Sequence, residues 1–287
     1  MRQARKLLLQ YSVGSGKDYR ESSLTVYEAI LGKLEDMAYT EHETLLQVSP
    51  GTIARFLGQH ANVNTAKRYA CFLDDFFAFF ENAGAISVSP AHRLREQYSY
   101  PEKVAPTTGF VADEAERAFL AALPKPKTWK KARDAAFLAL SLGTGLKTSE
   151  MINLNVRDVF LREVEPIVVV HHRHLSRAVP IRKEALPFID TWMKAREVAN
   201  LTELEEFFPA SPTGGRLNPS TVWRQARKVL EAAGLEELTH FGVSALRVSY
   251  ALRENESGSN LPILQHRLGH VRETSTLQLL HNASSSG

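Results

Sequence analysis

Residues 143–150 read Gly143-Thr-Gly-Leu-Lys-Thr-Ser-Glu150 and directly follow an apolar stretch, residues 129–142, with the periodicity of a helix. This segment leads into Leu154-Asn-Val-Arg-Asp158. Three more short motifs follow along the chain: Arg177-Ala-Val-Pro-Ile181, Ser244-Ala-Leu-Arg247 and Leu268-Gly-His270. Each motif is weak by itself, but their order and spacing together are specific.

This order of motifs resembles the tyrosine recombinase family, which includes the phage integrases and the chromosome-dimer resolvases. That family carries Gly-Thr-Gly-Leu-Arg-x-Ser-Glu, then a lysine-bearing β-hairpin that ends in Arg-x-Val-Pro-Leu. His-x-Leu-Arg-His and Leu-Gly-His follow, and a nucleophilic tyrosine comes shortly after them. The resemblance spans nearly the whole chain. It implies a mainly α protein with a small β-hairpin or sheet (α+β), in which a helical SAM-like core-binding domain precedes a catalytic-fold domain.

The resemblance also implies roles for individual residues, beginning with the phosphate-binding pair. In the family two arginines bind the scissile phosphate, whose negative charge grows in the transition state. Lys147 stands where the first arginine belongs, so it keeps the charge but loses the bidentate fork. Arg247 matches the second arginine, and His270 matches the histidine of Leu-Gly-His.

At the remaining family positions the chain departs from the pattern. His172 aligns with the hairpin lysine, a general acid toward the leaving 5′ oxygen, and a histidine can also donate a proton. Ser244 replaces the first histidine of His-x-x-Arg, with His240 four residues earlier. Leu280, or Leu279 by strict counting, aligns with the position of the family's nucleophilic tyrosine.

The nucleophile is the decisive departure. Leucine forms no phosphotyrosyl bond, and the last tyrosine in the sequence, Tyr250, lies on the apolar side of the Arg247 helix, where a core aromatic is expected. His281 or a serine of the tail could act instead only with a base or a spacing that the sequence does not supply. The resemblance therefore implies a degenerate active site.

Length and composition agree with two globular domains and leave the function open. The 287 residues suggest two domains or one large one. Lys and Arg number 35 against 32 Asp and Glu, a net charge of +3, so any nucleic-acid surface must come from local clustering. Cys71 is the one cysteine, which excludes a disulfide framework and a cysteine-based zinc cluster. The longest apolar run, residues 135–142, is too short to span a bilayer.

The domain organisation is read from periodicity and from turn residues. We predict a helical domain over residues 1–100, a linker over 101–109 and the catalytic-like domain over 110–287. Helices are expected at 24–38, 52–59, 64–84, 111–123, 129–142, 186–199, 219–233, 243–254 and 261–268. Residues 164–170 and 177–181 are expected to pair as a small hairpin, and residues 283–287 to be disordered.

Two motifs that suggest other chemistry do not hold up. Gly14-Ser-Gly-Lys17 fails as a phosphate loop, because Tyr11 stands at the required earlier glycine and Asp18 follows the lysine in place of Ser or Thr. Among His171, His172 and His174, only His172 and His174 would share a face of a strand, and no third ligand lies at a convincing spacing, so a basic hairpin tip is favoured over a metal site. We predict neither a metal nor a cofactor.

The preferred interpretation is a cytoplasmic, nucleoid-associated protein whose two domains close around duplex DNA as a C-shaped clamp, without a membrane partner. For Lys67 and Arg68, the alternative is an ordinary solvent-exposed helix face. For Arg247, the alternative is a salt bridge to Glu150. The candidate DNA contacts are Lys67, Arg68, Arg173, Arg177 and Arg247, together with His270.

Three functions stay open. The first is an accessory or regulatory role in recombination or integration, beside an active tyrosine recombinase or through self-association on DNA. The second is a recombinase that still cuts, with an unusual nucleophile or one supplied in trans. The third is a protein-interaction module that has lost DNA binding, which the balanced charge permits.

Overall fold

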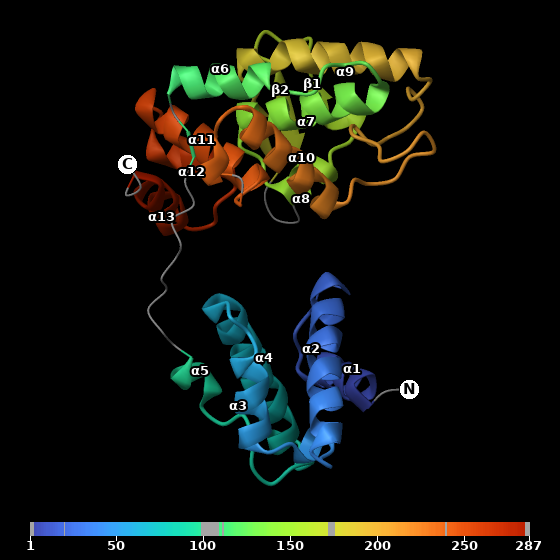
Figure 1. Cartoon of the computed structure of the whole chain (residues 1–287), viewed down its shortest axis with the longest axis vertical. Helices are drawn as coiled ribbons and strands as arrows, with labels where there is room; N and C mark the ends of the chain where they lie inside the picture. The colour runs from blue at the N-terminus through green and yellow to red at the C-terminus, as the bar shows by residue number, and fades with distance from the viewer. Residues whose placement is uncertain are drawn as a thin grey trace. The chain divides into compact units, whose positions relative to one another are not determined.

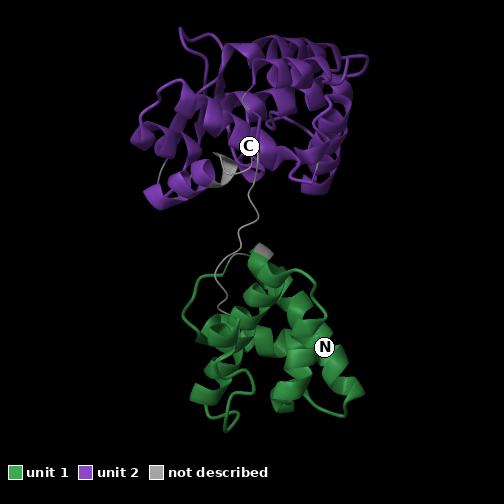
Figure 2. Cartoon of the chain, turned by 60° about the vertical axis from the view of Figure 1, so that its left-hand side comes forward, with its two compact units in different colours: residues 1–103 green, residues 104–287 purple. Residues whose placement is uncertain are grey.

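The computed structural model divides the chain into two compact units, residues 1–103 and residues 104–287 (Figure 2). It describes residues 3–19, 21–98, 109–110, 112–171, 176–238 and 240–284. The division falls within the linker expected at 101–109, and that segment's first eight residues lie outside the described ones. No helix among the described residues is long and apolar enough to cross a membrane. The mainly helical α+β class is confirmed.

The first unit is helical, as its periodicity predicts (Figure 1). The Ser49 hydroxyl caps α3 by accepting the backbone N–H of Thr52 at 3.2 Å, and Pro50 occupies the first turn. Asn62 caps α4, which begins at Val63, one position before the expected start at residue 64. The helices are α1 (Gln3–Gly14), α2 (Glu21–Thr40), α3 (Pro50–Gly58), α4 (Val63–Asn82) and α5 (Leu94–Gln97), with a 3₁₀ turn at Leu45–Gln47.

The aromatic stripe of α4 forms the core of the first unit. Phe72, Leu73, Phe76 and Phe80 are all buried, as a helix with this stripe requires. The Tyr11 ring of α1 meets Phe72, Phe76 and Phe79 edge-on, and its hydroxyl lies 2.7 Å from that of Tyr19. On the other side of α4, Lys67 is half-buried and Arg68 is exposed.

The second unit surrounds the buried helix α7 with helices and a small sheet (Figure 1). Its helices are α6 (Asp113–Ala121), α7 (Trp129–Thr144), α8 (Thr148–Ile152), α9 (Leu186–Val198), α10 (Pro219–Ala232), α11 (Val243–Glu256), α12 (Leu261–Leu268) and α13 (Glu273–Ser284). The 3₁₀ turns are Val156–Asp158, Lys183–Ala185 and Glu236–Leu238.

The sheet confirms the predicted hairpin and adds a strand. β2 (Ile167–Val170) pairs antiparallel with β3 (Arg177–Pro180), with Val170 opposite Arg177. β2 starts three residues later than expected, and β1 (Val159–Phe160) pairs along its other edge. A strand of two residues is too short to show an alternation of apolar and polar residues in the sequence. The hairpin tip, residues 172–175, lies outside the described residues.

The end of the chain differs from the expectation of disorder from residue 283. α13 continues to Ser284, and its Leu279 and Leu280 pack on Tyr250, Leu264 and Leu268 of α11 and α12. Apolar anchoring on one face is enough to extend a helix through Ala and Ser, which have acceptable helix propensity.

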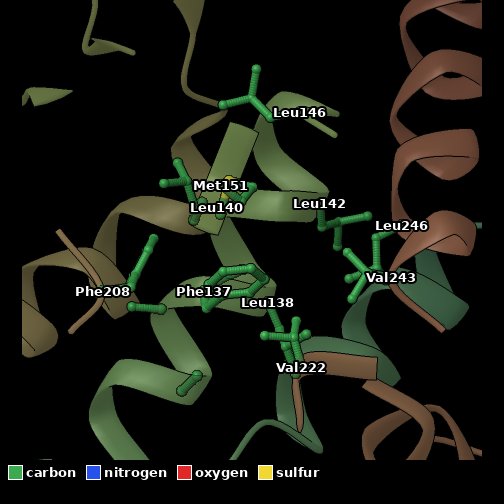
Figure 3. Packing of buried hydrophobic residues seen from close by; sticks show 14 of the residues in the cluster. Phe137, Leu138, Leu140, Leu142, Leu146, Met151, Phe208, Val222, Val243 and Leu246 are labelled. Carbon is green, nitrogen blue, oxygen red and sulfur yellow. The ribbon is translucent and has the colours of Figure 1, made fainter. Parts of the chain in front are cut away.

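Packing on α7 fixes the position of α11. Every residue of α7 from Ala135 to Thr144 is buried. Figure 3 shows Val243 and Leu246 of α11 beside Leu142, and Val222 of α10 beside Leu138. Leu246 is 0% exposed, so the residue that follows it, Arg247, leaves the core from a rigid support.

Buried arginines tie loops to helices in this unit. The Arg196 side chain on α9 is 2% exposed as a residue, and it stacks over Trp192. Its two Nη atoms donate four hydrogen bonds of 2.6–3.2 Å, all to backbone carbonyls. The acceptors are Leu201, Leu204, Glu206 and Phe207. A guanidinium that satisfies four carbonyls, two of them in fully buried hydrogen bonds, replaces the regular secondary structure that this loop lacks.

We expect Arg196→Ala to lower the free energy of unfolding of the second unit by about 3 kcal/mol or more, because buried carbonyls lose their donors and a cavity remains. Urea unfolding followed by tryptophan fluorescence measures this, since Trp129, Trp192 and Trp223 all lie in this unit. Arg157→Ala, at a side chain that is 79% exposed, is the control and should change stability by less than about 0.5 kcal/mol. Equal effects of the two substitutions would contradict the role given to Arg196.

Candidate functional site

The turn after α7 brings a backbone carbonyl to Arg247. Gly145 ends the helix with φ +62°, and a Cβ there would lie 2.3 Å from Cδ1 of Tyr250. Only glycine fits both the left-handed backbone and the close approach. The Gly145 carbonyl accepts a 2.6 Å hydrogen bond from Nη1 of Arg247.

The end of α12 brings a second backbone carbonyl to Arg247. Gly269 has φ +63°, and a Cβ there would lie 2.6 Å from Cζ of Arg177. The carbonyl of the preceding residue, Leu268, accepts a 2.7 Å hydrogen bond from Nη2 of Arg247. The Gly269 carbonyl oxygen lies 3.5 Å from Nζ of Lys147. The glycines of the two motifs therefore place backbone oxygens around the site's cations.

Arg247 is the central cation. Besides the two carbonyls, its Nη2 lies 2.9 Å from Nε2 of His270. Its pKa is lowered to about 10, mainly by burial; Glu150 opposes the shift and the nearby Arg177 contributes to it. The guanidinium stays protonated at pH 7, but it is poorly hydrated and an anion would stabilise it.

Glu150 organises the other cations. Its Oε2 accepts the backbone N–H of Lys147 at 2.8 Å and Nη2 of Arg177 at 2.8 Å. Hydrogen bonds from Arg177 and from the Lys147 backbone hold the pKa of the Glu150 carboxyl below its usual value, although burial acts in the opposite direction. The salt bridge that the sequence suggests as an alternative for Arg247 is thus made by Arg177.

Arg177 itself is turned into the protein. Its side chain is 3% exposed, and its Nε donates to the carbonyl of Arg267 at 2.9 Å. The prediction that Arg177 contacts DNA does not fit this burial, because the guanidinium is already paired and shielded from solvent. Arg177 acts as a support that joins β3 to α8 and α12.

His270 completes the cluster. Its Nδ1 lies 2.9 Å from Oγ1 of Thr276, which is 0% exposed. Burial, together with the charges of Arg247, Lys147 and Arg177, lowers the pKa of His270 to about 4, although Glu150 opposes the shift. The ring is therefore neutral at pH 7.

The charges of this cluster do not cancel. Lys147, Arg177 and Arg247 carry three positive charges, and Glu150 supplies one negative charge. Desolvation lowers the pKa of Lys147, Glu150 opposes the shift, and Arg247 and Arg177 add to it. Lys147 is exposed and Arg247 is half-buried, so the positive charge meets solvent at these two residues.

The structure brings Lys147, Arg247 and His270 together, with Arg177 as their buried neighbour. Ser244 is exposed and lines a shallow depression of about 340 Å³ with Thr148, Trp223 and Phe241. His240 is exposed, and its ring lies against Phe241. His172 and Arg173 lie outside the described residues, and Lys67 and Arg68 belong to the first unit.

The two leucines predicted to stand at the nucleophile position lie on α13. Leu279 and Leu280 are half-buried, and both pack on the apolar cluster that includes Tyr250. Tyr250 is 1% exposed, which confirms its expected place in the core, and burial raises its pKa to about 12. A buried phenol so hard to ionise is not a replacement nucleophile.

Sequence reasoning missed one residue that supports the site and gave another a different partner. Glu150 was expected as a possible partner of Arg247, whereas in the structure it pairs with Arg177 and caps the start of α8. Thr276 carries no local signal, because its contact with His270 appears only when α13 folds back beside α11 and α12.

A family model described as the phage integrase family matches residues 110–285, more than half of the chain. The chain belongs to this family, the tyrosine recombinases involved in DNA recombination. The match covers α6 to α13 and therefore all of the cluster described above.

Curated relatives carry the same assignment. The chain is 30% identical over 151 residues to the tyrosine recombinase XerC of Proteus mirabilis, which is 52% of this chain and 47% of that protein. It is 25% identical over 246 residues to a tyrosine recombinase of Thermosipho africanus, covering 84% of this chain and 78% of the relative. The match to the Proteus mirabilis protein thus spans about half of its length.

Solved structures show the same fold at low identity. The XerH site-specific recombinase, in a post-cleavage complex with its palindromic difH substrate, aligns with a TM-score of 0.67 at 19% identity, over 84% of this chain and 71% of that chain. The Tn1549 transposon integrase in complex with circular intermediate DNA aligns with a TM-score of 0.68 at 17% identity, over 96% and 94% of the two chains.

We expect Glu150→Gln to destabilise the second unit by about 2 kcal/mol at pH 7, because it leaves the buried Arg177 without its counter-charge. The depressed pKa fixes the pH dependence. The carboxylate's contribution is complete above the ordinary pKa of 4.5 and is lost as the pH falls through the lower folded value. The gap to the wild type should be constant from pH 7 to about 5 and narrow below that.

Urea unfolding at several pH values measures this gap. Glu231→Gln removes an exposed carboxylate that pairs with Arg227, so it serves as the control and should cost less than about 0.5 kcal/mol. A gap for Glu150→Gln that does not change with pH would contradict the importance of the ionised carboxylate.

Proposed function

We propose that the second unit binds duplex DNA through backbone phosphates at Lys147, Arg247 and His270, and that the protein takes part in DNA recombination or integration without cutting DNA itself. The observation that carries this proposal is the uncompensated positive charge of the cluster. An ordinary structural ion network would be close to neutral, whereas here three cations meet one carboxylate in a partly desolvated place.

A phosphodiester suits this cluster chemically. Its two non-bridging oxygens accept hydrogen bonds and carry the negative charge that the cluster lacks. Arg247 is held by two carbonyls in a fixed orientation, so little side-chain freedom is lost when it binds. Relatives of the same fold are described in complexes with DNA, among them XerH and the Tn1549 integrase.

The proposal that the protein does not cut DNA rests on the predicted lack of a nucleophilic tyrosine. Strand cleavage in this family proceeds through a tyrosine, and Leu279 and Leu280 occupy that place with their side chains packed on an apolar cluster. Ser244 and Lys147 depart from the family pattern as well, so several groups that act together are altered. We therefore favour an accessory or regulatory role, beside an active recombinase or through self-association on DNA.

Two other functions are separated by experiment. A recombinase with a nucleophile supplied in trans would form a covalent adduct with DNA when its partner is present. A protein-interaction module would show no salt-dependent binding to DNA. The contribution of Lys67 and Arg68 in the first unit stays a prediction.

We expect the full chain to bind a mixed-sequence duplex with an affinity that falls steeply with salt. If about six phosphates are neutralised, log affinity against log salt concentration has a slope near −5. Fluorescence anisotropy between about 50 and 200 mM salt measures it. A flat response, or the absence of binding at low salt, contradicts the proposal.

Arg247→Ala should weaken this binding and reduce the salt slope by about 1, the value expected for one lost phosphate contact. Arg247→Lys keeps the charge without the fork and should lie between the two proteins. Arg117→Ala on α6, whose side chain is 72% exposed, is the control and should bind like the wild type. Lower thermal stability with unchanged DNA affinity would instead make Arg247 a structural residue.

We expect no covalent protein–DNA adduct on a nicked duplex in a denaturing gel, and none from Leu280→Tyr alone. Restoring one group while others are missing recovers little rate, and a nucleophile displaced by one position loses orders of magnitude. A joint reversion to Lys147→Arg, His172→Lys, Ser244→His and a tyrosine at 279 or 280 has the best chance of forming an adduct. An adduct from the wild type would refute the degenerate-site proposal, and one from Leu280→Tyr alone would show a more competent site.

A further inference from the structure

Thr276 contacts the one ring nitrogen of His270 that faces away from the cations. Its Oγ1 lies 2.9 Å from Nδ1, while Nε2 lies 2.9 Å from Nη2 of Arg247. A guanidinium only donates hydrogen bonds, so Nε2 must be the acceptor in that contact. The proton of the neutral ring is then on Nδ1 and is donated to the Thr276 hydroxyl oxygen. Thr276 is 0% exposed, so water does not compete with its hydroxyl for Nδ1.

We propose that Thr276 is a positioning residue that keeps the proton of neutral His270 on Nδ1 and directs Nε2 at Arg247, so that an anion binding to this pair is taken up together with one proton on Nε2. The inference deepens the proposed function and rests on it, because the anion at this site would be a DNA phosphate. It assigns a role to a residue of α13 that lies six positions from the histidine.

Hydrogen-bond accounting leads to the proton. In the described structure both protons of Nη2 are used, one by the Leu268 carbonyl and one by His270. An anionic oxygen at the pair draws the second of these N–H groups away from Nε2, and then faces the Nε2 lone pair. Two acceptors in contact repel each other, whereas a proton taken from solvent turns Nε2 into a charged donor. The Nδ1–H bond to Thr276 is unchanged in this step.

Without a bound anion, the positive charges around His270 disfavour protonation of its Nε2. Lys147 at the start of α8, Arg177 on β3 and Arg247 on α11 face it with positive charge, and Glu150 on α8 is the opposing carboxylate. On α12, Arg267 pairs with Glu254, and on α13 Glu273 is exposed. Burial and the three cations hold the pKa of His270 at about 4.

A bound anion therefore raises the pKa of His270, and the binding affinity depends on pH. The sign follows from linkage: the bound state holds more protons than the free state, so the anion binds more tightly as the pH falls. The rise is at most about tenfold per pH unit, because one proton is taken up. The rise in affinity ends when the pH falls to the pKa of His270 in the protein without a bound anion.

Sulfate is the probe, because it stays dianionic across the pH range and carries no base or sugar. The full chain, labelled with ¹⁵N at histidine, is titrated with sulfate between pH 5 and 8 at constant ionic strength, and the ring nitrogens are observed by NMR. His270→Gln assigns the His270 signals among the 10 histidines. We expect neutral His270 with its proton on Nδ1 in the free protein, a raised pKa at saturating sulfate, and tighter sulfate binding at lower pH.

Two substitutions separate positioning from simple packing. Thr276→Val keeps the shape but removes the hydroxyl, so it should abolish the Nδ1–H signature and flatten the pH dependence of sulfate binding. Thr276→Ser restores the hydroxyl and should restore both properties. Thr274→Val, at an exposed position of the same helix, is the matched control and should behave like the wild type.

The outcomes are distinct from those of the proposed function. A proton on Nε2 in the free wild type, sulfate binding that does not vary with pH, or unchanged pH dependence in Thr276→Val would each overturn the inference. The inference would also be overturned if sulfate did not bind at any pH in the range. The anisotropy titration with duplex DNA is carried out in parallel, and normal DNA binding with any of these results leaves the proposed function standing. If Thr276→Val does not fold, the wild-type tautomer and pH dependence still decide the question.

Discussion

The ion pair between Glu150 and Arg177 supports the rest of the site. A buried pair is costly unless its remaining hydrogen-bonding groups are satisfied, and here the Arg267 carbonyl takes Nε of Arg177 while the Lys147 N–H shares Oε2 of Glu150. Three segments meet at this pair: the start of α8, strand β3 and the end of α12. Since α12 ends in the turn that presents Gly269 and His270, the positions of the cations depend on this internal ion pair.

Local motifs were sufficient to locate the site, and tertiary contacts were needed to assign roles within it. Gly145 and Gly269 are recognisable because a left-handed helix end demands glycine from the local sequence. The burial of Arg177 cannot be read locally, because its partner Glu150 lies 27 positions away. An arginine that looks like a DNA contact in a motif is therefore an internal support in the fold.

The same difference between local and distant causes explains how far the fold was predictable. The helices of the first unit follow from caps such as Ser49 and from the aromatic stripe of α4, both of which act within a few residues. β1 escaped prediction because its two residues form a strand only through their pairing with β2. Charge was the least informative signal: Arg133 and Arg196 are buried on backbone carbonyls, so the count of basic residues says little about the surface.

Leu279 and Leu280, which we predict to stand at the family's tyrosine position, also help to hold His270 in place. Leu279 and Leu280 pack on Tyr250, Leu264 and Leu268, and this contact holds α13 against α11 and α12. The same helix carries Thr276 to Nδ1 of His270. Side chains that cannot attack a phosphate thus contribute the burial that keeps the histidine oriented toward Arg247, since a helix of 12 residues needs an apolar face to stay in place. Binding of a phosphate requires that orientation as much as cutting does, so the Arg247–His270 pair fits the proposed binding role together with the leucine predicted at the nucleophile position.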